Sequence, residues 1–94
     1  MGANAARTAP ERENAVKYLI MEDFSGQSVV FIFPRRVDHL EMREQLPYKK
    51  AISAGYLELQ DGAIRCFGGH AELALHSRRQ DADIIRNSLR QREN

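Results

Sequence analysis

Three histidines, one cysteine and a glutamate are the first candidates for chemistry in this 94-residue sequence: His39, His70, His76, Cys66 and Glu72. A metal site would have to bring several of them within about 2 Å of one ion. His70, Glu72 and His76 share strand parity, but the two histidines would lie roughly 20 Å apart along an extended strand. The spacing therefore predicts no metal site, and these three side chains are expected to face solvent.

Nucleophilic and deaminase chemistry is also disfavoured. His70-Ala71-Glu72 matches the H-x-E fragment of zinc deaminases, yet that chemistry needs a later pair of cysteines and none follows Cys66. A Cys–His nucleophile needs an activated thiolate beside a base, whereas Cys66 alternates with Ile64 toward the expected core. P-loop, GxGxxG and G-x-S-x-G motifs are missing. We expect no catalytic residue, no cofactor and no enzymatic activity.

Three pairs of basic residues stand at the ends of the expected elements: Arg35-Arg36, Lys49-Lys50 and Arg78-Arg79. If these pairs converge, they form a positive patch that could contact phosphates. The aromatic residues do not alternate with them as base-stacking platforms require, and no helix-turn-helix or RNP pattern is present. The pairs predict either weak, salt-sensitive nucleic-acid binding or a solvated rim that keeps the domain soluble.

Composition limits the class of protein further. Fourteen Lys and Arg against thirteen Asp and Glu give a net charge of +1, which excludes a histone-like nucleic-acid wrap. Apolar residues make up 43%, enough for a small core, and one cysteine excludes a disulfide scaffold. The longest apolar run, residues 29–33, cannot span a membrane, and residues 1–12 lack a signal-peptide core. We expect a cytoplasmic protein without membrane contact.

The elements that must position these side chains follow from local patterns. Residues 1–14 are expected to be a flexible arm, and residues 15–94 a single α+β domain. Segments 16–22 and 28–33 are rich in β-branched and aromatic residues, which favours a hairpin with a five-residue loop between them. A short helix then begins after Asp38, which forms a capping box with Glu41, and ends near residue 46, before a proline.

Three extended segments and a helix are expected in the second half, at 52–59, 63–67, 71–76 and 78–90. Asp61-Gly62 predicts a tight turn, and Gly68-Gly69 predicts a break before the third segment. Ser77 and Gln80 are expected to cap the final helix. The order ββαβββα predicts an α+β fold with one mostly antiparallel sheet, a short central helix and a C-terminal helix packed on the sheet.

Apolar residues occupy both faces of the first hairpin and of the segment 52–59. Two short helices are expected to cover one face of such a sheet and to leave the other open. Large open apolar faces usually mark interaction sites. The sequence therefore predicts a homodimer, or docking on a partner, through the sheet. Closure of the sheet into a half-barrel is the alternative.

The second half also carries a recognisable series of motifs. They are Ile52-Ser53-Ala54-Gly55-Tyr56, Arg65-Cys66-Phe67-Gly68, Leu73-Ala74-Leu75 and the run 77–85, with Ile32-Phe33-Pro34 and His39 upstream. This series resembles a family of small proteins common in phage and prophage genomes, over residues 16–90. The sequence departs from the family where Gly69-His70 replaces a common Glu-Ser pair. The resemblance implies a phage-related origin and no particular activity.

The position of His39 in that family pattern makes it the first choice for a functional side chain, although packing at the helix start is the favoured explanation for this residue. The expected function is a non-enzymatic protein–protein interaction module, and with the resemblance its expected partner is a second copy of the chain or a host or phage protein. The alternative is a nucleic-acid-associated accessory protein that uses the Arg and Lys pairs. Residues expected to take part in an interaction are His39, Arg35, Arg36, Arg78 and Arg79.

Overall fold

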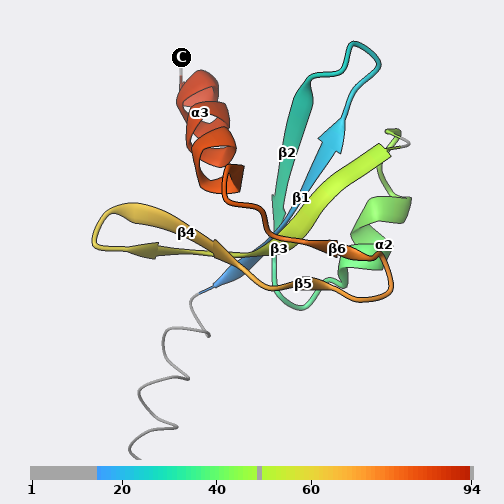
Figure 1. Cartoon of the computed structure of the whole chain (residues 1–94), viewed down its shortest axis with the longest axis horizontal. Helices are drawn as coiled ribbons and strands as arrows, with labels where there is room; N and C mark the ends of the chain where they lie inside the picture. The colour runs from blue at the N-terminus through green and yellow to red at the C-terminus, as the bar shows by residue number, and fades with distance from the viewer. Residues whose placement is uncertain (1–14, 49, 94) are drawn as a thin grey trace, which may run out of the picture.

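The computed structural model describes residues 15–48 and 50–93, and this part of the chain has an α+β fold (Figure 1). Its main sheet has four antiparallel strands in the order β2-β1-β3-β4: β1 (Val16–Glu22), β2 (Ser28–Phe33), β3 (Lys50–Gln60) and β4 (Ala63–Phe67). Strands β5 (Gly69–His70) and β6 (Leu75–His76) form a second, two-stranded sheet. The helices are α2 (His39–Glu44) and α3 (Asp81–Glu93). The predicted fold class is confirmed, and the arm predicted at 1–14 lies outside the described residues.

Strand β1 is central because it pairs with β2 on one side and with β3 on the other. Lys17 lies opposite Phe33 of β2 and Tyr56 of β3. A β-bulge interrupts the β1–β3 pairing between Ile20 and Met21, so the strands twist locally more strongly there. Strands β1, β2 and β4 have the predicted bounds, while β3 is longer than predicted at both ends.

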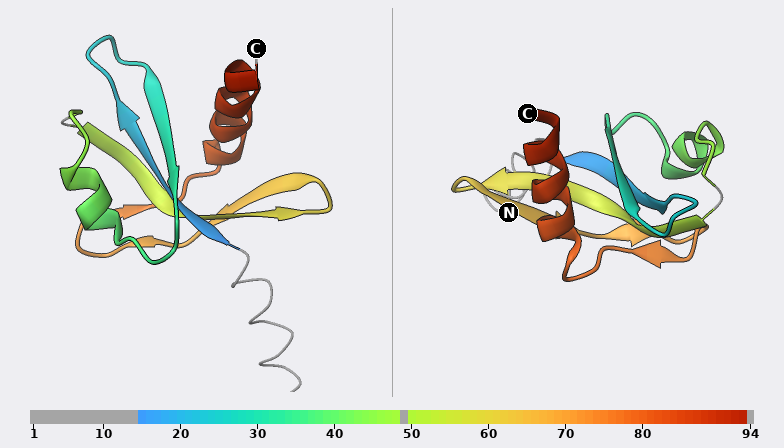
Figure 2. Two further views of the ribbon diagram at one scale, coloured as in Figure 1. Left: turned by 180° about the vertical axis from the view of Figure 1, so that it is seen from behind. Right: turned by 90° about the horizontal axis from the view of Figure 1, so that it is seen from above.

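The two helices cover opposite faces of the sheet, as the views in Figure 2 show. On one face Tyr18 and Ile20 pack in a cluster with Ile85 of α3. On the other face Leu19 packs in a cluster that includes Met42 of α2. Residues 18–21 of β1 are all fully buried. The expectation that the helices leave one face of the sheet open is therefore wrong for this strand.

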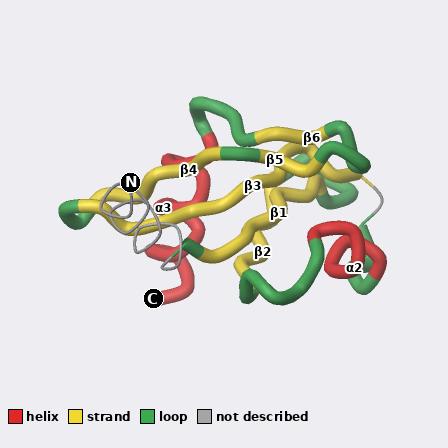
Figure 3. Tube along the Cα trace, turned by 90° about the horizontal axis from the view of Figure 1, so that it is seen from below, coloured by secondary structure: helices red, strands yellow, loops and turns green. Residues whose placement is uncertain are grey.

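The segment 71–76 is not the continuous strand that the alternating pattern predicts. Residues 71–74 form a turn, with the Ala74 N–H donating to the Ala71 carbonyl over 3.0 Å and with Ala74 at a φ of 56°. Strands β5 and β6 on either side pair as a hairpin. After Gly68, β5 continues along the direction of β4 beside β3, as Figure 3 shows. Leu73 and Leu75 still pack against the cluster that contains Leu19, which explains the apolar pattern.

Helix α3 begins at Asp81, three residues later than predicted. The backbone N–H of Ser77 donates to the carbonyl of Gly68 over 2.8 Å, which holds Ser77 in the chain entering the helix rather than at its cap. The Asp81 carboxylate instead accepts hydrogen bonds from the backbone N–H and the Nε of Arg78, each over 2.9 Å. No helix in the described part of the chain has the length and apolar character needed to cross a bilayer.

Candidate functional site

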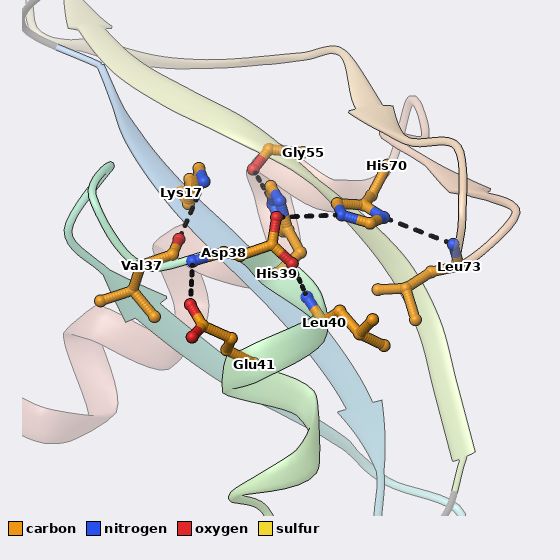
Figure 4. Close-up of polar contacts among 9 residues, drawn as sticks. All are labelled: Lys17, Val37, Asp38, His39, Leu40, Glu41, Gly55, His70 and Leu73. Carbon is orange, nitrogen blue, oxygen red and sulfur yellow. Dashed lines mark hydrogen bonds and ion pairs between the residues drawn. The ribbon is translucent and has the colours of Figure 1, made fainter.

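The capping box at the start of α2 brings the first polar groups together, as Figure 4 shows. Oδ2 of Asp38 accepts from the Leu40 N–H over 2.9 Å, and Oε1 of Glu41 accepts from the Asp38 N–H over 3.2 Å. These bonds satisfy backbone donors that have no partner within the first turn of a helix. The predicted capping box is confirmed, and it fixes where the next residue, His39, enters the fold.

His39 is buried, with 1% of its surface exposed. Its Nε2 donates a 2.9 Å hydrogen bond to the carbonyl of Gly55, and its ring meets the rings of Phe33 and Tyr56 edge to face. Burial lowers the pKa of His39, although the Gly55 carbonyl partly opposes that shift. This geometry gives His39 the packing role that the sequence favours, and it keeps the ring away from the surface.

His70 lies next to His39, with 5.4 Å between the ring centroids. The Leu73 backbone N–H donates to its Nδ1 over 3.3 Å, so Nε2 carries the proton of the neutral ring and donates to Oδ1 of Asp38 over 3.2 Å. Both ring nitrogens of His70 are therefore engaged in holding the β5–β6 turn against α2. The expectation that His70 faces solvent is wrong, since its side chain is 13% exposed.

Lys17 extends the cluster along β1. Its Nζ donates a 2.8 Å hydrogen bond to the Val37 carbonyl, and it lies 6.0 Å from the centroid of the Tyr56 ring. That distance is at the limit of a cation–π contact. The ammonium is thereby held beside an aromatic ring at a defined position.

Tyr56 and Phe67 face each other across β3 and β4, with their rings stacked at 5.6 Å and 18° between the planes. Both rings line a hollow of about 260 Å³, together with Ala15, Arg35 and Gly68. Gly68 has a φ of 75°, and a Cβ there would lie 3.0 Å from Cδ1 of Tyr56. We call this concavity, defined by these five residues, the aromatic hollow. It combines an apolar ring pair with the exposed guanidinium side chain of Arg35.

The structure places Arg35 and Lys50, from the first two basic pairs, near opposite ends of β1. Arg35 lines the aromatic hollow, and Arg36 is exposed beside it in the chain. Lys50 pairs with Glu22 over 3.2 Å, at the far end of β1 from Lys17, about 17 Å along the strand. Lys49 lies outside the described residues.

The third basic pair lies near the start of α3. Arg78 makes an ion pair with the buried Asp81 over 2.8 Å, and Arg79 is exposed. The Arg78 side chain therefore holds the entry to the helix. Among the predicted interaction residues, Arg35 is the one that the structure places in the aromatic hollow.

Cys66 does not join the histidines. It packs with Tyr18 on the face that α3 covers, whereas His39 and His70 lie on the side of α2. Burial raises the pKa of the Cys66 thiol to about 11, which disfavours the thiolate. Within residues 15–48 and 50–93, no group of His, Cys, Asp and Glu side chains is arranged to hold a metal ion.

Tyr56, Phe67 and Lys17 belong to the site but are not indicated by the motifs of the sequence. A usable signal was present for the first two. Asp61 and Gly62 form a two-residue turn in which both have positive φ, as in a type I′ hairpin. Counting outward from Gln60 and Ala63 places Tyr56 opposite Phe67. Tyr56 and Phe67 do not alternate with basic residues along the chain, but the fold brings both rings next to Arg35.

Comparisons with family models, with curated proteins and with solved structures found no match for this chain. The function is therefore inferred from the geometry of the aromatic hollow and of the residues around it.

Proposed function

We propose that this chain is a non-enzymatic interaction module whose binding surface is the aromatic hollow. The observation that carries the proposal is the stacked pair of Tyr56 and Phe67 in a concavity beside Arg35. The residues that line the hollow come from strands and loops, so neither helix has to move to admit a ligand. Concave sites with apolar rings and a few placed polar groups are the usual form of ligand sites.

The positions of the reactive groups support binding rather than catalysis. His39 is buried and hydrogen-bonded to the backbone, and His70 uses both ring nitrogens within the fold. Cys66 lies on the opposite face of the sheet. A nucleophile and a base within hydrogen-bond reach of each other are the minimum for covalent catalysis, and these three residues do not supply that pair.

The burial of β1 moves the expected binding surface away from the sheet face. Because both faces of this strand are covered, the apolar contact area has to be sought elsewhere. Phe24 and Leu59 are large apolar side chains that remain exposed, at 88% and 74%, but each stands near the tip of a hairpin. The aromatic hollow offers a concave surface instead. Homodimerisation and a phage or prophage origin stay predictions.

Binding of the dye 8-anilinonaphthalene-1-sulfonate tests the proposal, because this probe is both planar and anionic. The full chain is expected to enhance its fluorescence saturably. Phe67→Ala should weaken binding about tenfold, since a stacking contact is worth about 1–3 kcal/mol. Arg35→Gln should also weaken binding of the dye, because it removes the positive charge from the lining of the hollow.

Phe24→Ala is the matched control, because it removes an exposed ring outside the hollow and should leave dye binding unchanged. Thermal melting shows whether each variant is folded. Dye binding that is absent, or that Phe67→Ala and Arg35→Gln both leave intact, would overturn the proposal.

A further inference from the structure

We propose that the aromatic hollow binds single-stranded nucleic acid, with one base stacked on the Tyr56–Phe67 pair and the adjoining phosphate held between Arg35 and Lys17. This inference rests on the proposed function and names the class of ligand. It depends on three features of the site: its ring pair, its size and the placement of its charges.

The ring pair suits an unpaired base. Every nucleobase has a flat π-face, so aromatic side chains bind bases by stacking without reading their sequence. The hollow measures about 260 Å³, which is below the range of about 300–1,000 Å³ typical of pockets for drug-sized ligands. A single ring system therefore fits better than a larger ligand. In a duplex each base is already stacked on both sides, so its faces are unavailable to Tyr56 and Phe67.

The charges suit the backbone that accompanies such a base. Lys17 is held beside the Tyr56 ring by its 2.8 Å hydrogen bond to Val37, so its ammonium is in place before a ligand arrives. Arg35 lines the hollow and is exposed to solvent. A planar guanidinium can bind a phosphate through two N–H donors. The two cations therefore provide a site for about one or two phosphates next to the ring pair.

Acidic residues also lie near the ring pair. Glu58 lies two residues from Tyr56 on β3, where it is buried and stands opposite Arg65 of β4 in the register. The Asp38 carboxyl has a lowered pKa, mainly because it accepts from the Leu40 N–H, and the nearby Lys17 ammonium adds to that shift. Because Lys17 shares its charge with Asp38, Arg35, which lines the hollow, is expected to make the stronger contact with the phosphate backbone.

The site places stacked rings next to two cations, which favours a nucleic acid over an acidic peptide as the ligand. Carboxylates would satisfy Arg35 and Lys17 but would leave the stacked rings without a planar partner. A nucleotide supplies a planar ring and an anion within one residue. The near-neutral charge of the whole chain, +1, also favours a short local contact over a wrap around duplex DNA.

Fluorescence anisotropy with a labelled short oligothymidylate, and with oligouridylate of the same length, tests the inference on the full chain at low salt. Saturable binding to both is expected. The slope of log K against log salt should lie between about −0.7 and −1.4, since the site holds one or two phosphates and each one neutralised on a single strand contributes about −0.7. Phe67→Leu should weaken binding about tenfold. Arg35→Gln should reduce the slope by about 0.7.

Arg79→Gln is the matched control, because it removes an exposed arginine that does not line the hollow and should leave both affinity and slope unchanged. A duplex of the same length should fail to compete. Equal losses in Arg79→Gln and Arg35→Gln would indicate diffuse charge attraction and would overturn the inference, as would effective competition by the duplex.

Two further outcomes separate this inference from the proposed function. If the oligonucleotides do not bind while the anionic dye still binds in a Phe67-dependent way, the ligand class is wrong and the binding surface stands. If a tyrosine-containing acidic peptide binds at the hollow more tightly than the oligonucleotides, the ligand class is again wrong and the binding surface stands. If neither the oligonucleotides nor the dye bind, both proposals fail.

Discussion

The phenolic hydroxyl of Tyr18 donates a 2.6 Å hydrogen bond to Oδ2 of Asp81, which lies 63 residues further along the chain. Both side chains are fully buried. Tyr18 belongs to the central strand β1, and Asp81 is the first residue of α3. Arg78 completes the arrangement by donating to the same carboxylate. The bond therefore joins the start of the C-terminal helix to the middle of the sheet.

Removing the Tyr18 hydroxyl should destabilise the fold. Tyr18→Phe leaves the ring in place but deprives a buried carboxylate of one donor, which costs about 1–3 kcal/mol of unfolding free energy. Urea unfolding followed by circular dichroism measures the change. Tyr48→Phe, which removes a hydroxyl from a half-buried ring packed on Phe31, should change the stability by less than about 0.5 kcal/mol. Equal effects of the two substitutions would contradict the assigned role.

Alkaline conditions should destabilise the same region. Burial, and then the neighbouring Asp81, raise the pKa of Tyr18 far above its usual value near 10, and burial raises the pKa of Cys66 to about 11. A group whose pKa is higher in the folded state contributes stability at pH values below its pKa in the unfolded chain. That stability is lost as the pH rises toward the pKa of the folded state. The unfolding free energy is therefore expected to fall as the pH increases above about 9. Tyr18→Phe should flatten this dependence, and ultraviolet titration should show one tyrosine that ionises only on unfolding.

Acidic conditions should destabilise the α2 side of the sheet. Burial lowers the pKa of His39, and Lys17 and His70 nearby act in the same direction. Because the folded protein disfavours the charged form of His39, this residue contributes stability above its pKa in the unfolded chain, about 6.5. That stability is lost as the pH falls through the pKa of the folded state. His39→Phe should reduce this loss of stability below about pH 6.5. Imidazole signals in NMR spectra report the titration directly, and a His39 that titrates at or above the ordinary value would contradict it.

A methyl group at position 68 should damage both stability and binding. Gly68→Ala forces an L-residue to a φ of 75°, which costs about 1–2 kcal/mol, and its Cβ crowds the Tyr56 ring. Gly62→Ala is the matched control, since Gly62 has a φ of 81° with no atom within 4 Å of such a Cβ. Both variants should lose similar stability in urea, but only Gly68→Ala should weaken dye binding at the aromatic hollow. Unchanged dye binding in Gly68→Ala would show that Tyr56 is not held by this contact.

Local signals in the sequence predict the parts of this fold that depend on local chemistry. The strands β1, β2 and β4, the Asp61-Gly62 turn and the Asp38 cap all follow from residue types within a few positions. The turn at 71–74 has no such signal, because Ala74 takes a positive φ and the His70 side chain accepts the Leu73 N–H. An alternating apolar pattern there indicates a strand, although the same leucines pack equally well from a turn.

The candidate site depends more strongly on long-range order. Tyr56 and Phe67 can be paired by counting from their turn. Lys17 joins them only because β1 lies between β2 and β3, and Arg35 only because the chain after β2 returns to that end of the sheet. The strand order cannot be read from any of these residues alone. The sequence therefore does not show that Lys17 and Arg35 lie near the ring pair while other basic residues do not.

The burial of β1 on both faces has a consequence for the accuracy of folding. In a sheet with one solvent-exposed face, a strand that shifts by one residue against its neighbour exposes its apolar side chains and buries its polar ones. Here a slip would drive the Tyr18 hydroxyl into the apolar pocket built for Leu19 and would leave Asp81 facing a hydrocarbon chain. The apolar residues alone would tolerate the error, since they occupy both faces. The buried Tyr18 hydroxyl therefore helps to specify the correct alignment of a strand whose fully buried residues, 18–21, are otherwise apolar.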